Sequence, residues 1–245
     1  MLLVILGGLL PAAADFGPPD VPYENVPYDG RFAFTRLRFT PSRWGPGDYA
    51  WGLDLKWNHD YPRSDSHLSK ILQATTTIDV ALEGTDIFAL DDPELFRHPV
   101  AYVCEPGFWT MTEAEARSLR EYMLKGGFVI VDDFRGPHWY AFVEGLGRVL
   151  ADARLIPLEA THPIFDVFFR IDPYTIHHPY FAPGPPAYYG VFEDNDPTRR
   201  LMLVANYNSD ISEYWEWSDT GFIPIELSNE AYKLGVDYVV YGMTH

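Results

Sequence analysis

The clearest pattern of apolar and polar positions lies in the middle of the chain, where two apolar runs flank a segment with helical periodicity. These three segments span residues 100–104, 113–125 and 128–131. Thr112 and Glu115 predict a capping box at the start of the helix, and Gly126 and Gly127 predict a C-cap at its end. A strand, a helix and a strand joined by short links predict a βαβ unit, whose parallel strands are buried on both faces.

Further elements follow from the same kinds of pattern. Strands are expected at residues 32–39, 77–82, 154–158 and 201–205, and helices at residues 64–72, 138–150 and 229–241. The proline-rich stretch at residues 179–186 is expected to be a loop. Strands that alternate with helices in this way predict an α/β fold, here a three-layer sandwich with a mostly parallel central sheet.

The first thirty residues do not share these patterns. Residues 1–14 are apolar, are too short to span a bilayer as a helix, and end in small residues, as a signal peptide does. They lack a basic beginning, and a buried N-terminal strand is the alternative. Residues 15–30 are rich in proline and glycine and are expected to form an extended arm. Residues 31–245 then form one α/β domain of an exported protein, which would be periplasmic or extracellular.

Composition narrows the range of partners. The net charge is −17, and the chain has no cluster of Lys and Arg suited to a phosphate backbone, which argues against nucleic acid. The single cysteine, Cys104, excludes an intrachain disulfide framework. The hydrophobic content of 47% is enough to fill the core of a domain of this length.

The apolar run at residues 128–131 ends in two adjacent carboxylates, Asp132 and Asp133. Ligands of open parallel sheets bind outside the carboxyl ends of the strands, and successive residues leaving a strand point in different directions. One side chain is therefore expected to face a ligand while the other caps the next loop or helix. The alternative is that both accept backbone N–H groups in a turn.

Two further polar clusters are candidate ligand-binding regions. DLKWNHDY, residues 54–61, mixes charged groups with aromatic rings, which suits sugars and other ring-bearing ligands. NYNSDISEYWEW, residues 206–217, directly follows a predicted strand. The candidate ligand-binding residues in these clusters are Asp54, Trp57, Asp60, Asn208 and Asp210. The alternative for each cluster is a surface loop held together by its own side chains.

The histidines and the cysteine form no complete catalytic or metal-binding motif. No pair of histidines has HExxH spacing and no CxxC occurs, so no metal site and no cofactor are assigned. A mixed Asp/His site for Mg²⁺, Ca²⁺ or Mn²⁺ stays open. Cys104 ends a predicted strand, but VCEPG lacks the glycines of a nucleophile elbow and the next helix begins only near Thr112. We therefore expect Cys104 to be a buried apolar residue.

Seven short stretches, taken together, resemble the DUF4159 family. They are FTRL (34–37), YV (102–103), LREY (119–122), KGGFVIVDD (125–133), HPIF (162–165), NSD (208–210) and NEAYKLGVDY (229–238). The resemblance implies an exported or membrane-anchored bacterial protein with a glutamine-amidotransferase-like or flavodoxin-like fold. ThuA-like proteins are similar around the helix–GG–strand segment and the His-Pro-Ile turn. Amidotransferases use an elbow cysteine, and this sequence departs from them at Cys104.

Three functions remain open. The first is a non-catalytic module that binds a protein partner, a small molecule or a carbohydrate at the strand ends, and it is favoured because no catalytic site is complete. The second is a hydrolase or lyase acting on a carbohydrate-like substrate, with Asp132 or Asp133 as general base and His162 as acid or orienting residue. The third is a subunit of an extracellular assembly, a homo- or hetero-oligomer formed through residues 15–30.

Overall fold

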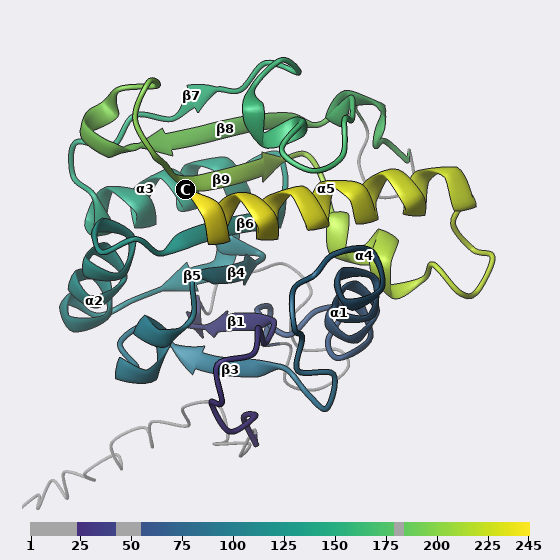
Figure 1. Cartoon of the computed structure of the whole chain (residues 1–245). Helices are drawn as coiled ribbons and strands as arrows, with labels where there is room; N and C mark the ends of the chain where they lie inside the picture. The colour runs from purple at the N-terminus through teal and green to yellow at the C-terminus, as the bar shows by residue number, and fades with distance from the viewer. Residues whose placement is uncertain (1–23, 43–54, 179–183) are drawn as a thin grey trace, which may run out of the picture.

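The computed structural model describes residues 24–42, 55–178 and 184–245, and a seven-stranded sheet forms its centre (Figure 1). The strands of this sheet are β1 (Thr35–Arg38), β3 (Asp86–Ala89), β4 (Val100–Cys104), β6 (Phe128–Phe134), β7 (Ile156–Pro157), β8 (Ala187–Phe192) and β9 (Leu201–Tyr207). Their order is β3-β1-β4-β6-β9-β8-β7. The first five strands in this order are parallel, and β8 and β7 run antiparallel to their neighbours. The predicted mixed α/β fold with a mostly parallel sheet is confirmed. β2 (Thr40–Pro41) and β5 (Trp109–Thr110) form a separate antiparallel pair.

Helices cover both faces of the sheet. They are α1 (Arg63–Thr75), α2 (Glu113–Leu124), α3 (His138–Val149), α4 (Ile211–Glu216) and α5 (Ile225–Thr244). One face of the sheet is covered by α1, α4 and α5, and α5 crosses this face in Figure 1. The other face is covered by α2 and α3. Neighbouring side chains of one strand alternate between the two cores, as Tyr102 and Val103 do in β4. Within the described ranges, no helix is both long enough and apolar enough to cross a membrane.

The βαβ unit formed by β4, α2 and β6 has the boundaries that its local signals predict. The Thr112 hydroxyl accepts the N–H of Glu115 at 3.2 Å, and the Glu115 carboxylate accepts the N–H of Thr112 at 2.6 Å, so the capping box is complete. At the other end, the N–H of Gly126 bonds to Met123 O and that of Gly127 bonds to Tyr122 O. This pair of hydrogen bonds is a Schellman motif, with Gly126 in the left-handed region.

The path of the chain reverses at β1. From β1 the chain passes through α1 to β3 on one side, and it then places β4 on the other side of β1. As a result, α1 and α2 pack on opposite faces of the sheet. Open α/β sheets bind ligands beyond the carboxyl ends of the strands at such a reversal, so the residues that follow β1 and β4 are of special interest.

One expected strand does not form, and three elements were not expected. The strand expected at residues 77–82 is reduced to a single bridge between Val80 and Phe32, and the edge strand is β3. β3 was missed because it has only four residues and begins with the buried carboxylate of Asp86. β8 was missed because it directly follows the proline-rich stretch. α4 was missed because its acidic residues obscure the buried apolar positions between them.

Replacing Gly126 with valine is expected to destabilise the fold by about 1–3 kcal/mol, because a β-branched residue avoids its φ of +116°. Replacing Gly127 with valine is expected to have at least as large an effect. A Cβ at that position would lie 2.4 Å from the ring of Tyr122, whose hydroxyl is fixed by a hydrogen bond to His98 O. Thermal and urea melts measure both effects.

Gly147→Ala in α3 is the matched control for these glycine variants. An added Cβ at Gly147 would meet no atom within 4 Å, and alanine favours the helix over glycine. This variant is therefore expected to melt at or slightly above the temperature of the wild-type protein. Wild-type melting of the Gly126 variant would contradict the Schellman assignment.

Candidate functional site

Asp132, the first of the paired carboxylates, lies inside the protein and has no exposed surface. Its Oδ2 accepts hydrogen bonds from the Tyr102 hydroxyl (3.0 Å) and from the backbone N–H groups of Ile211 (2.8 Å) and Ser212 (3.3 Å). Its Oδ1 accepts one from Asn206 Nδ2 at 3.1 Å. Burial raises the pKa of Asp132 to about 6, although these four donors act to lower it. Asp132 thus ties β9 and the start of α4 to β6.

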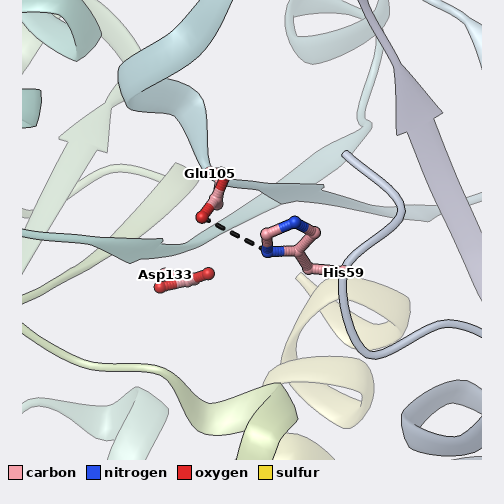
Figure 2. A group of neighbouring side chains, drawn as sticks. All are labelled: His59, Glu105 and Asp133. Atoms are coloured by element: carbon pink, nitrogen blue, oxygen red, sulfur yellow. Dashed lines mark ion pairs between the residues drawn. The ribbon is translucent and has the colours of Figure 1, made fainter. Parts of the chain in front are cut away.

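Asp133, the second carboxylate, points to the carboxyl edge of the sheet. The pairing of β6 with β9 shifts its register between Val131 and Phe134, and Asp133 lies in this irregularity with a φ of +55°. Its carboxylate approaches Glu105 and His59, as Figure 2 shows. These three side chains each offer one potential ligand atom, and the three atoms all lie within 4.8 Å of one another.

Glu105 comes directly after β4 and has a left-handed backbone with a φ of +47°. Its N–H bonds to Asp132 O at 3.1 Å, which fixes the end of β4 against β6. Its Oε1 lies 3.3 Å from His59 Nδ1, and its Oε2 lies 3.6 Å from Lys56 Nζ. The Lys56 ammonium also lies over the Phe108 ring, 4.5 Å from its centroid. Glu105 is therefore held in place by the Lys56 ammonium, by the imidazole of His59 and by its own backbone.

A second acidic group adjoins the first. The carboxylates of Asp60, Glu213 and Glu216 also offer ligand atoms within 4.8 Å of one another. The Ser212 hydroxyl donates a hydrogen bond to Asp60 Oδ2. The Tyr102 hydroxyl lies 2.8 Å from Ser212 Oγ and 3.0 Å from Asp132 Oδ2, and it donates its single proton to one of them at a time. A row of close polar contacts thus connects this second group to the enclosed carboxylate.

The carboxyl groups of the site raise one another's pKa values. Burial raises the pKa of Asp133 well above its usual value, and the negative charges of Glu105 and Asp60 raise it further. Burial and the charges of Asp133 and Asp60 raise the pKa of Asp210 in the same way. The pKa of Glu213 rises to about 8 because of burial and its hydrogen bond with Asp60. These groups consequently favour an added proton or another positive charge.

Backbone conformation also sets this region apart. Seven non-glycine residues of the described chain have positive φ, and four of them are Lys56, Asp60, Glu105 and Asp133. Such conformations are uncommon and carry strain, which concentrates where a structure must hold side chains in one geometry. Glu105 follows β4, and Lys56 and Asp60 lie between β1 and α1, so the site forms where the direction of the chain reverses.

The structure brings some of the predicted ligand-binding residues together but not others. Asp60 and Asp210 belong to the acidic site, where Asp210 also caps α4 by accepting the N–H of Glu213. Asn208 donates to the carbonyl groups of Gly184 and Pro185 and thus holds a loop. Trp57 is buried in the core beneath α2 and α3. Asp54 lies outside the described residues.

Two of the three candidate catalytic residues need correction. His162 accepts the N–H of Ile164, and its ring packs on Phe192, which pairs with the first residue of β9. This places His162 at the opposite edge of the sheet, roughly 20 Å from the carboxyl end along a seven-residue strand. His162 is therefore no partner of Asp133. Asp132 is enclosed and cannot act as a base on a ligand at the edge.

Sequence reasoning missed His59, Glu105, Glu213 and Glu216. The signal for Glu105 was present, because it follows an apolar strand just as Asp132 follows the neighbouring one. His59 comes from the stretch between β2 and α1, and no local sequence pattern predicts that it lies beside Glu105 and Asp133. Cys104 is fully buried, and burial, with the nearby charge of Asp133, raises the pKa of its thiol, as expected for an inert residue.

Comparison with known proteins identifies a family. The model of a family described as "Domain of unknown function (DUF4159)" matches residues 46–243, which is most of the chain. No curated protein matches this sequence. The matched range contains every residue of the acidic site but begins after β1, the strand that lies between β3 and β4.

Proposed function

The chain belongs to the DUF4159 family, and we propose that its domain is a non-catalytic binding module whose ligand is held through a divalent cation at the carboxyl edge of the sheet. The observation that carries this proposal is the convergence of His59, Glu105 and Asp133, with ligand atoms within 4.8 Å of one another. Two carboxylates and an imidazole provide mixed oxygen and nitrogen donors, which suit Mn²⁺ and related divalent ions.

The charge of the surroundings supports a cationic occupant. Asp60, Asp210 and Asp132 add negative charge around Asp133 and Glu105, and the ammonium of Lys56 offsets only part of it. The oxygen Glu105 Oε2 is buried and accepts no hydrogen bond from the described residues, and the Lys56 ammonium lies 3.6 Å from it. A divalent ion would give this oxygen a direct bond and would relieve the repulsion between the carboxylates.

We infer a flavodoxin-like or glutamine-amidotransferase-like fold from the order of the strands. The five parallel strands β1, β3, β4, β6 and β9, numbered 1 to 5 along the chain, lie in the order 2-1-3-4-5, which is the flavodoxin-like order. The left-handed residue after β4 is Glu105, while Cys104 lies inside the sheet. This arrangement favours ligand binding by a carboxylate over chemistry by a thiol.

Export remains part of the proposal and rests on the sequence. The expected signal peptide, residues 1–14, lies outside the described residues. An exported binding module in the periplasm or outside the cell fits a short apolar leader followed by a segment rich in proline and glycine.

Mn²⁺ is expected to bind the metal-free protein in calorimetric titrations, and Asp133→Asn is expected to weaken this binding by roughly tenfold or more, since it removes a charged ligand. The fold should tolerate this variant, because asparagine adopts the left-handed region readily. Glu121→Gln, on the exposed side of α2, removes the same charge away from the site and is the matched control. Mg²⁺ and Ca²⁺ titrations establish the preference among ions.

The proposal fails if Mn²⁺ does not bind, or if Asp133→Asn and Glu121→Gln weaken binding equally. The second result would indicate diffuse attraction of cations to an acidic protein. A loss of binding in Glu105→Gln, with an unchanged melting temperature, would add direct support for the assigned ligand set.

A second candidate function is hydrolysis of a carbohydrate-like substrate, and one observation favours it. Glu213 has a pKa of about 8 and so keeps its proton at neutral pH beside Asp60, as a general acid must. In this function Asp133, at the edge, would act as the base in place of Asp132. Turnover of a glycoside that disappears in Glu213→Gln, while Mn²⁺ binding persists, would favour the enzyme over the binding module.

A further inference from the structure

β3 is the outermost strand on its side of the sheet, and part of its backbone faces away from β1. The N–H of Asp86 bonds to Phe34 O at 2.9 Å, so the backbone N–H of Asp86 points toward β1, on the inner side of β3. Because alternate residues of a strand bond to alternate sides, the N–H and C=O groups of Ile87 point outward. An outward-facing row of this kind is a template for pairing with another chain.

The segment formed by residues 24–31 covers this edge with a side chain instead of a strand. Asn25 Oδ1 accepts the N–H of Ile87 at 2.8 Å, and Asn25 Nδ2 donates to Ile87 O at 3.2 Å. The amide of one side chain thus occupies both groups that a neighbouring strand would take. The N–H of Val26 adds a hydrogen bond of 2.8 Å to the carboxylate of Asp86.

Aromatic and charged contacts secure the rest of this segment. The ring of Tyr28 meets that of His98 edge-on at 5.8 Å, and the guanidinium of Arg97 lies over Tyr28 at 5.3 Å. Arg31 pairs with Asp29 and with Glu83 beyond the edge. The described end of the predicted arm therefore packs on its own domain, whereas the hypothesis of an assembly had this arm reach a neighbour.

We propose that the outward edge of β3 is a self-association surface for a second copy of this chain, and that residues 24–31 are a built-in cap that keeps it closed. The geometry is self-complementary: two copies of Ile87 related by a twofold axis can exchange both hydrogen bonds as an antiparallel pair. The pairing is short, because Ala89 O is already taken by the N–H of Asp92. The uncapped edge is thus suited to a reversible dimer.

The test detaches the cap in the full chain by the combined substitutions Asn25→Ala, Val26→Pro and Tyr28→Ala. Sedimentation and light scattering over a range of concentrations are expected to show a dimer that forms about tenfold or more tightly than any dimer of the wild type. Exchange of the Ile87 amide hydrogen, followed by NMR, is expected to be fast at low concentration and slowed where the dimer forms.

Adding Ile87→Pro to this combined variant provides the decisive control. Proline lacks an N–H but is tolerated on edge strands where that group faces outward, so the pairing with β1 persists while the dimer is lost. Circular dichroism verifies the fold. A combined variant that stays monomeric, or a dimer that survives Ile87→Pro, would overturn the proposal.

Discussion

Replacing Asp132 with alanine is expected to destabilise the protein by about 3–5 kcal/mol, which makes it one of the most damaging single changes in this chain. The carboxylate accepts hydrogen bonds from Tyr102, Asn206 and the first two N–H groups of α4, and all four donors are buried. Alanine would leave the Asn206 amide and the two backbone N–H groups without an acceptor, whereas Tyr102 could still donate to Ser212. Alanine would also open a cavity at the join of β6, β9 and α4. Urea unfolding measures the effect.

Asp132→Asn separates the loss of hydrogen bonds from the loss of charge. The oxygen of the new asparagine can keep the hydrogen bonds from Tyr102 and α4, while its NH₂ group would face the NH₂ group of Asn206. The amide of Asn206 can rotate to present its oxygen instead, because its other neighbour, the Tyr238 hydroxyl, can either donate or accept a hydrogen bond. The expected loss is smaller, about 1–2 kcal/mol. Asp91→Ala, on an exposed loop, is the control and should stay within about 0.5 kcal/mol of the wild type. Equal stability of the alanine variant and this control would refute the anchoring role.

The melting temperature of the metal-free protein is expected to fall by roughly 5 °C as the pH rises from about 6.5 to about 8.5. The pKa of Asp237 is raised to about 7 and that of Glu213 to about 8, and those of Asp133 and Asp210 are raised well above the usual value, in each case mainly by burial. In this window the folded protein binds more protons than the unfolded chain does. Its stability is therefore lost as the pH rises through the raised pKa values.

Most of this window lies above the titration of the histidines. Burial lowers the pKa values of His98, His138 and His162, so the unfolded chain takes up their protons first and these groups reduce stability as the pH falls through about 6.5. Thermal melts in the presence of a chelator at about pH 7.5 and above measure mainly the carboxyl effect. A melting temperature that rises steadily with pH would contradict the expectation.

Two additions to this experiment identify the groups responsible. In Asp237→Asn, the amide oxygen takes the place of Oδ1, which accepts the N–H groups of Phe168 and Phe169. The NH₂ group takes the place of Oδ2, which accepts no hydrogen bond from the described residues. This variant is expected to flatten the pH dependence and to stabilise the protein at the upper end of the window. Mn²⁺ is expected to raise the melting temperature more at high pH than at low pH, because protons and the cation compete for the same carboxylates.

Much of the fold follows from local sequence signals, and the prediction fails where these local signals are weak. The helix of the βαβ unit begins at Glu113 because a capping box requires it, and the chain leaves the helix at Gly126 because few other residues adopt that backbone conformation. β3 and α4 escaped prediction because each is short and carries buried polar residues, which only tertiary hydrogen bonds make tolerable.

The sequence by itself determined that the chain is an α/β protein and that a buried strand ends in two carboxylates at the carboxyl edge of the sheet. It could not determine which carboxylate is enclosed and which lies at the edge of the sheet. This depends on hydrogen bonds from the first N–H groups of α4 to Asp132, which is about eighty residues away in the sequence. The meeting of His59, Glu105 and Asp133 was likewise decided only by the tertiary structure. Each of these residues comes from a different segment, and the reversal of the chain at β1 brings the segments to one edge.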